Sequence, residues 1–296
     1  MKPPYLQYGD KIAIISPSGD IDPTLIDNAA KILESWDLVP VIGRNAKNKY
    51  GRYAGTPKER LEDLQWAFDQ KEIKAVICSR GGYGLVQIID EVDFSHFELY
   101  PKWLVGFSDI TILHMSIAAY DIASCHGIMA KDISANGKAA AALKKLLFGD
   151  LTEYAENGPH PLNRTGNAEG KIVGGNLSVM CGMRGTHFDL DPQGKILFIE
   201  DIGEKPYQID RYIWNLRIGG ILEQISGLIV GQFNEYEEDE DMKASVYELI
   251  ANAVADYNYP VAFGFSAGHI DNNLSLPFGV DTVMSVANEG VSLRFF

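Results

Sequence analysis

The stretch KWLVGFSDITILHMSIAAY, residues 102–120, joins a short apolar run directly to a segment with helical spacing. Residues 102–107 predict a buried strand and residues 109–120 a helix. The same alternation fills the chain before it, with strands expected at 11–16, 38–42 and 73–79 and helices at 23–36, 57–68 and 83–89. Such alternation is typical of a parallel sheet covered by helices on both faces. The first half therefore predicts an open, mainly parallel α/β sheet, Rossmann-like or flavodoxin-like.

The second half follows a polar stretch between about residues 148 and 170 that contains Pro159, Pro161 and several Gly and Asn. Such a composition predicts a linker. Beyond it we expect helices at 207–218 and 242–257, and strands at 195–200, 227–230, 261–263, 282–286 and 291–295. The chain then divides into an N-terminal α/β domain over 1–155, a linker over 156–168 and a smaller C-terminal mixed α/β domain over 169–296.

The composition and net charge of the chain indicate which kinds of molecule the protein does not bind. The chain has 296 residues, of which 46% are hydrophobic and 22% charged, as in ordinary globular proteins. Its formal net charge of −14 disfavours binding to nucleic acid or to an anionic membrane surface. The sequence contains neither a signal-peptide core nor an apolar run of 18 residues, so we expect a cytoplasmic protein.

The cysteine and histidine spacing gives no support for a metal site. Cys78, Cys125 and Cys181 stand far apart and form no CxxC pair, which argues against a disulfide framework and a thiolate site. The six histidines form neither HxxxH nor HExxH.

Ser108 is the first candidate for chemistry because it lies where the predicted strand 102–107 turns into a helix. A hydroxyl there is exposed, and the amides that follow it can stabilise an oxyanion. The arrangement is similar to the nucleophile elbow G-x-S-x-G, although Ile110 replaces the second glycine. Serine is also a favoured helix N-cap, so spacing alone leaves both interpretations open.

Three further segments carry candidate groups. The segment SRGGYG at 79–84 follows a predicted strand, and its glycines let backbone amides approach an anionic ligand. Within it, Arg80 can either pair with a substrate carboxylate or form a surface ion pair. ILFIED at 196–201 ends in carboxylates that can orient an imidazole or cap a helix. GFSAGHIDNNLSLPFG at 264–279 holds His269 in a loop, where functional residues are common. Together these segments give only a weak Ser…Glu…His order, which is also that of α/β-hydrolases.

The whole set of segments resembles the LD-carboxypeptidases, also called muramoyltetrapeptide carboxypeptidases. The similarity rests on eight segments that occur in the family's order across nearly the whole chain: IAIISPSG, AGTPKERLEDLQWAF, ICSRGGYG, LVGFSDIT, HGIM, GGNLS, LFIEDIGEKPYQIDR and GHIDNNLSLPFG. The resemblance implies a serine peptidase with a Ser-Glu-His triad formed by Ser108, Glu200 and His269. The serine would lie on the N-terminal domain, the other two residues on the C-terminal domain, and the site in the cleft between them.

The resemblance also implies a reaction. Family members work in the cytoplasm on recycled cell-wall peptides, and they release the terminal D-alanine of a murein tetrapeptide by cutting a bond between an L and a D centre. No metal and no organic cofactor is required, and homodimers are usual. For this chain we expect the amides of Gly82 and Asp109 to form the oxyanion hole, and Arg80, Gly81 and Tyr83 to bind substrate.

Two alternatives remain open at this point. A sister branch with the same triad confers microcin C immunity by cleaving an amide in an aminoacyl-nucleotide, which would need an aromatic platform for the adenine. Trp36, Trp66, Trp103 and Trp214 all fall in predicted regular elements, so we favour the peptide substrate. The other alternative is a non-catalytic protein that holds an anionic ligand in the SRGGYG loop.

Overall fold

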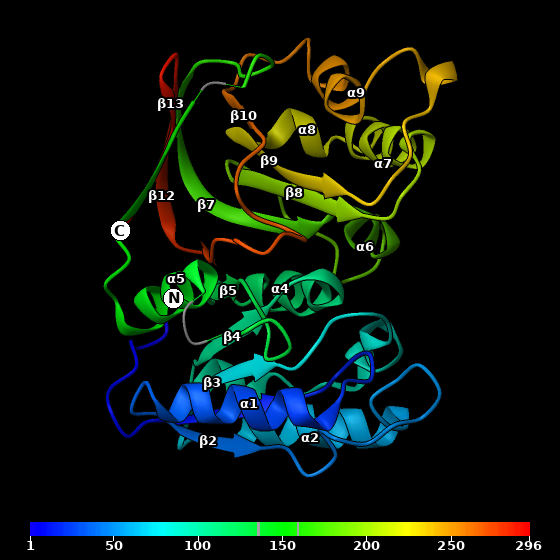
Figure 1. Cartoon of the computed structure of the whole chain (residues 1–296). Helices are drawn as coiled ribbons and strands as arrows, with labels where there is room; N and C mark the ends of the chain where they lie inside the picture. The colour runs from blue at the N-terminus through cyan, green and yellow to red at the C-terminus, as the bar shows by residue number, and fades with distance from the viewer. Residues whose placement is uncertain (135–136, 159) are drawn as a thin grey trace.

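The first of two β-sheets forms the lower half of the molecule in Figure 1. The computed structural model describes residues 1–134, 137–158 and 160–296. The strand order of this sheet is β11-β5-β4-β3-β1-β2. Its strands are β1 (Lys11–Ile15), β2 (Val39–Ile42), β3 (Ile73–Cys78), β4 (Trp103–Gly106), β5 (Ser124–His126) and β11 (Leu276–Phe278). The first five run parallel, and β11 pairs antiparallel with β5.

Helices cover both faces of this sheet because its strands are apolar on both sides. Ile14 and Ile77 pack in one cluster with the buried faces of α1 (Pro23–Glu34) and α5 (Lys138–Phe148). The alternate residues Ile15 and Val76 pack on the other face, with α2 (Pro57–Asp69) and α4 (Thr111–Ala118). A short helix, α3 (Ser95–Leu99), adds Phe97 to the same side. Burial on two faces is typical of parallel sheets.

The second sheet lies above the first in Figure 1 and has the order β10-β9-β8-β7-β12-β13-β6. Its parallel part is β7 (Gly166–Asn176), β8 (Ile196–Ile202), β9 (Gly227–Asn234) and β10 (Val261–Phe263). Its antiparallel part is β12 (Asp281–Ala287), β13 (Gly290–Phe295) and β6 (Glu153–Asn157). Its helices are α6 (Leu177–Gly182), α7 (Pro206–Ile218), α8 (Ile221–Gln224) and α9 (Val246–Ala253). The predicted fold class, a mainly parallel α/β sheet followed by a mixed α/β part, is confirmed.

Two of the predicted segments differ most from the structure. The helix expected at 83–89 is instead a pair of 3-10 turns, Leu85–Gln87 and Ile89–Glu91. The expected linker at 156–168 overlaps the end of β6 and the start of β7, while Pro159 lies outside the described residues. Strand β7 was not predicted because it contains four glycines, and glycine is depleted in strands.

The division into 1–155, 156–168 and 169–296 stays a prediction, and two strands pair across it. β6 begins before residue 156 but pairs with β13 in the second sheet. β11 comes late in the chain but pairs with β5 in the first sheet. The chain therefore crosses back between the sheets near its C-terminal end.

Helix α4 joins the two sheets. A single cluster of buried apolar side chains runs from β3 through Leu113 of α4 to Val173 of β7 and Leu197 of β8. At the end of β7, the Asn176 amide donates a hydrogen bond to Thr111 Oγ1 at 3.0 Å. Gly175 makes this approach possible because a Cβ there would lie 2.5 Å from Thr111 Oγ1.

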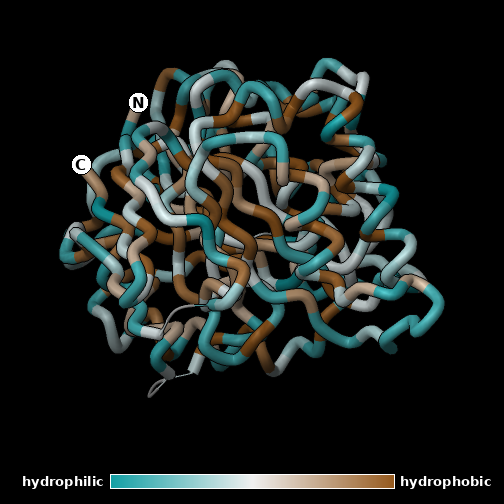
Figure 2. The backbone as a smooth tube through the Cα atoms, turned by 90° about the horizontal axis from the view of Figure 1, so that it is seen from above, coloured by the Kyte–Doolittle hydropathy of each residue, from teal (hydrophilic) through white to brown (hydrophobic). Residues whose placement is uncertain are grey.

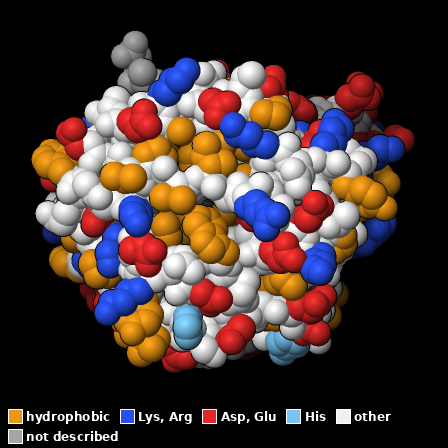
Figure 3. Space-filling model, turned by 90° about the horizontal axis from the view of Figure 1, so that it is seen from below, with side chains coloured by type: hydrophobic (Ala, Val, Ile, Leu, Met, Phe, Trp, Pro, Cys, Tyr) orange, Lys and Arg blue, Asp and Glu red, His pale blue; other side chains and the backbone are white. Residues whose placement is uncertain are grey.

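The surface carries both signs of charge. Hydrophobic segments lie toward the middle of the molecule and hydrophilic ones around its rim (Figure 2). The face seen from below mixes acidic and basic side chains around smaller groups of hydrophobic ones (Figure 3). Within the described ranges, no helix combines the length and the apolar composition needed to span a membrane.

We predict that Gly175→Ala destabilises the protein by about 3 kcal/mol or more, because a φ of +136° is strained for alanine and Thr111 would have to move. A lower urea midpoint of unfolding would measure the loss. The matched control is Gly185→Ala, whose φ is +78° and whose Cβ would meet no atom within 4 Å. This control carries backbone strain without the clash, so equal losses in both variants would contradict the packing argument.

Candidate active site

Ser108 adopts a backbone conformation that is uncommon for its residue type. It follows β4 and Phe107, has a φ of 65°, and begins a 3-10 turn, Ser108–Ile110, that leads into α4. Its side chain caps neither the turn nor the helix. The N-cap interpretation is therefore wrong. A non-glycine residue at positive φ is strained, and such strain persists where a site needs it.

The SRGGYG loop lies against Ser108 through Gly81. A Cβ on Gly81 would stand 2.8 Å from Ser108 Cβ, 3.0 Å from Ser108 Oγ and 3.3 Å from the Asp109 amide nitrogen. Only glycine leaves room for the nucleophile candidate here. Gly82 instead faces Gly19, whose Cα would be 3.3 Å from a Cβ on Gly82. The oxyanion-hole assignment to Gly82 and Asp109 stays a prediction.

Two buried charged side chains, Asp109 and Arg60, hold this loop through hydrogen bonds to its backbone. Asp109 is 3% exposed, and its Oδ2 accepts a hydrogen bond from the Leu85 amide at 3.0 Å. Burial raises the pKa of Asp109, while the Leu85 amide and the positive charge of Arg60 act in the opposite direction. Arg60, 1% exposed, donates to the carbonyls of Gly84 at 2.8 Å and Pro17 at 3.0 Å. These contacts fix the loop relative to the turn that carries Ser108.

Glu200 and His269 form a hydrogen-bonded pair. The His269 Nδ1 and Glu200 Oε2 atoms are 2.7 Å apart, and the two side chains are 14% and 0% exposed. Glu200 lies in β8, and His269 lies in the loop between β10 and β11. Asn234 Nδ2 donates to the His269 carbonyl at 2.8 Å, and the Gly268 amide donates to Asn273 Oδ1 at 2.9 Å. The loop therefore presents the imidazole to the carboxylate in one orientation.

The environment of His269 favours its charged form. Burial alone would lower the pKa of His269, but the hydrogen bond and the negative charge of Glu200 raise it above 6.5. Glu200 thus stabilises an imidazolium, as a triad carboxylate must. The next carboxylate, Asp201, points elsewhere: it accepts from Asn176 Nδ2 at 2.9 Å and from the Ser178 amide at 2.7 Å. Burial raises the pKa of Asp201 to about 6.

Phe107 brings the serine and the histidine to the same place. Its ring centroid lies 4.8 Å from that of His269, and Ser108 is the next residue. In the described part of the chain, no hydrogen bond joins Ser108 Oγ to His269. Hydrogen bonds between catalytic groups are often long before substrate binds. The triad stays a prediction that this proximity supports.

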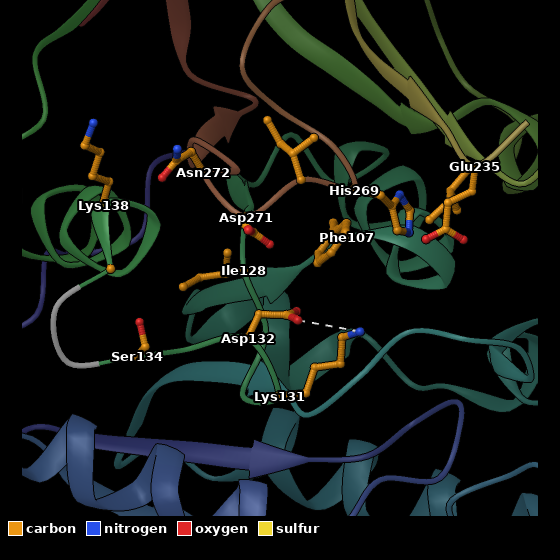
Figure 4. Close-up of a pocket in the computed structure, with 13 residues that line it drawn as sticks. Phe107, Ile128, Lys131, Asp132, Ser134, Lys138, Glu235, His269, Asp271 and Asn272 are labelled. Atoms are coloured by element: carbon orange, nitrogen blue, oxygen red, sulfur yellow. Dashed lines mark ion pairs between the residues drawn. The ribbon is translucent and has the colours of Figure 1, made fainter.

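The residues predicted to bind substrate are absent from the lining of the cavity beside His269. Arg80 donates to the Asp20 carbonyl at 2.8 Å, and its NH1 lies 4.0 Å from Asp20 Oδ1. Tyr83 is 45% exposed, with its ring 6.1 Å from that of Tyr53. The cavity, of about 560 Å³, is lined by Phe107, Ile128, Lys131, Asp132, Ser134, Gly137, Lys138, Ile202, Glu235, His269, Ile270, Asp271 and Asn272 (Figure 4). Substrate binding by Arg80, Gly81 and Tyr83 stays a prediction.

Sequence reasoning missed the charged side chains of this cavity. Lys131 and Asp132 follow the short strand β5 and form an ion pair at 3.5 Å, drawn in Figure 4. They lie five and six residues after His126 in HGIMAKD, so the HGIM segment is the sequence feature that could have pointed to them. His126 itself is fully buried against Phe107, Phe198 and Phe278, and is absent from the cavity lining.

Comparison with known proteins gives a consistent result over nearly the whole chain. Residues 12–127 match the LD-carboxypeptidase N-terminal domain, and residues 169–284 match the LD-carboxypeptidase C-terminal domain. A probable murein peptide carboxypeptidase of Bacillus subtilis is 36% identical, covering 97% of this chain and 92% of that protein. The murein tetrapeptide carboxypeptidase of Pseudomonas aeruginosa is 30% identical, covering 96% and 95%.

Solved structures agree in fold. The muramoyltetrapeptide carboxypeptidase from Oxalobacter formigenes superposes with a TM-score of 0.87 at 27% identity, covering 96% of this chain and 98% of the other. The microcin C7 self-immunity protein MccF, in complex with aspartyl sulfamoyl adenosine, gives a TM-score of 0.88 at 21% identity, covering 99% and 98%. At this identity the second likeness shows the fold alone.

We predict that Glu200→Gln lowers the pKa of His269 from above 6.5 to below 6.5. The substitution removes the negative charge that opposes burial and leaves the effect of burial in place. An NMR titration of the histidine Cε1–H resonances measures the change, with His269→Gln assigning the signal. Glu204→Gln, a nearby carboxamide substitution outside the pair, serves as control. A His269 pKa that stays above 6.5 in Glu200→Gln would contradict this account.

Proposed function

The chain belongs to the LD-carboxypeptidase family and is a serine-type carboxypeptidase, and from this premise we propose that it releases the terminal D-alanine of murein tetrapeptides. The bond cut would be the one between an L and a D centre. The observation that carries the proposal is the hydrogen bond between Glu200 and His269 beside the strained Ser108. The names of the relatives from B. subtilis and P. aeruginosa support murein peptides as the substrate class.

The mechanism assigns one task to each of the three residues. His269 takes the proton of the Ser108 hydroxyl as its oxygen attacks the scissile carbonyl carbon, and Glu200 stabilises the imidazolium that forms. His269 then donates the proton to the nitrogen of the departing D-alanine, which leaves an acyl-enzyme on Ser108. A water molecule, deprotonated by His269, hydrolyses that ester and frees the serine.

Backbone amides would hold the oxyanion of the tetrahedral intermediate. We propose the amides of Asp109 and Gly82 for this task. The position of the Asp109 amide directly after the nucleophile supports the first, and the membership of Gly82 in the loop that contacts Ser108 supports the second. The loss of one such donor lowers kcat by roughly 100- to 1000-fold in other serine hydrolases.

The cellular setting is part of the same proposal. We propose a cytoplasmic enzyme that recycles cell-wall peptides, works as a homodimer, and uses neither nucleic acid nor membrane as partner. The net charge of −14 supports the last point.

The tryptophans give the cavity no support for an aminoacyl-nucleotide substrate. None of Trp36, Trp66, Trp103 and Trp214 is among the described residues that line the cavity beside His269. Trp36 and Trp103 are buried in the core. An adenine base would therefore find no indole platform there.

Mass spectrometry of a diaminopimelate tetrapeptide tests the proposal. We predict that the wild type removes one alanine and that Ser108→Ala lowers kcat by roughly a millionfold, as in other serine triads. Ser35→Ala, which removes an exposed hydroxyl at the end of α1, is the control for folding and handling. The same assay offers an aspartyl sulfamoyl adenosine, and cleavage of that compound instead would favour the immunity-type activity. Wild-type behaviour of Ser108→Ala would favour a non-catalytic binding protein.

A further inference from the structure

A carboxypeptidase that removes a single residue has to recognise a free carboxylate close to its nucleophile, with a cation or with backbone amides. The carboxylate carbon of the last residue lies roughly 3 to 4 Å from the scissile carbonyl carbon, because only a nitrogen and a Cα separate them. A donor hydrogen-bonded to that carboxylate adds about 3 Å. A cation with this task therefore has to reach within about 7 Å of the attacked carbon.

Arg80, the cation expected from the sequence, is engaged elsewhere. Its guanidinium bonds the Asp20 carbonyl and lies near the Asp20 carboxylate, and it is absent from the lining of the cavity. Apart from His269, the basic side chains among the described lining residues are Lys131 and Lys138.

The backbone of Lys131 is anchored beside the nucleophile. Its amide donates to the Ser79 carbonyl at 3.0 Å, and the Ala130 amide donates to the Cys78 carbonyl at 3.0 Å. Ser79 begins the loop in which Gly81 contacts Ser108. Lys131 therefore lies just beyond the C-terminal end of β3, beside the loop that contacts Ser108.

The side chain of Lys131 points into the cavity that His269 also lines (Figure 4). Its charge acts on His269, where it opposes the effect of Glu200 on the pKa of the imidazole. Lys138 extends from the first turn of α5, at the other end of the cavity in Figure 4. Of the two lysines, Lys131 is therefore the one at the end of the cavity nearer His269 (Figure 4).

The surroundings of Lys131 keep its charge available. Asp132 Oδ1 lies 3.5 Å from Lys131 Nζ, a loose ion pair that orients the ammonium. An ammonium has three N–H donors, so one contact with Asp132 leaves donors for a ligand. The acidic side chains of Glu235 and Asp271 line other parts of the same cavity and would repel a carboxylate bound there.

We propose that Lys131 Nζ binds the C-terminal carboxylate of the substrate and so makes the enzyme an exopeptidase. This inference rests on the proposed function, since it assumes attack by Ser108 on the last peptide bond. It assigns to Lys131 the task that the sequence alone gave to Arg80.

The test compares one tetrapeptide as the free acid with the same peptide carrying a C-terminal amide. We expect the wild type to prefer the acid, and Lys131→Met to lower kcat/KM for the acid by about 10- to 100-fold, mainly through KM, while changing the amide little. Lys131→Arg should keep the preference because it keeps the charge. The ratio of the two rates within one variant does not depend on how much of that variant is folded.

The controls separate the possible failures. Lys31→Met, which removes an exposed lysine of α1, should leave the acid-to-amide ratio unchanged. A wild type that cleaves neither peptide would contradict the proposed function. If the wild type cleaves the acid and Lys131→Met still prefers the acid over the amide, only the carboxylate site is overturned. Loss of the preference in Arg80→Met, but not in Lys131→Met, would have the same meaning.

Discussion

The hydrogen bond from the backbone N–H of Asn176 to Thr111 Oγ1 is the contact on which the geometry of the site depends. Asn176 is the register partner of Glu200 across β7 and β8, so its position fixes that of the carboxylate. Thr111 stands three residues after Ser108, at the start of α4. One hydrogen bond between the second sheet and α4 therefore ties the neighbour of Glu200 to the helix that follows the nucleophile candidate. The adjoining Gly175, which has no side chain, lets the two elements approach this closely.

The end of β8 serves two purposes because successive side chains on a strand point to opposite sides. Glu200 faces His269, whereas Asp201 faces Asn176 and the first turn of α6. The strand that carries the carboxylate of the pair thereby also fixes Asn176, which caps α6 through Val179. Two adjacent acids that look like one motif in the sequence belong to different networks, one directed to chemistry and the other to structure.

The sequence was informative wherever local pattern and burial agree. The strands buried on both faces, such as β1 and β3, are apolar apart from the exposed Lys11 and Lys74, and their alternation with helices was enough to predict the parallel sheet. β7 was missed because its glycines are required by contacts with distant residues, which no local propensity encodes. Lys131 was missed for a related reason: its link to Ser79 joins residues far apart in the chain. Arg80 attracted attention by its place in a motif, although its guanidinium turns toward Asp20.

The loop that carries His269 is anchored on both sheets. It leaves the second sheet at the end of β10 and enters the first at β11, where Leu276 pairs with His126 of β5. β5 is the neighbour of β4, the strand that leads to Ser108. The imidazole is therefore positioned from one side through the strand next to the serine and from the other through its hydrogen bond to Glu200. Any movement of one sheet relative to the other would have to stretch this loop or break that bond, so the arrangement resists separation of the histidine from either partner.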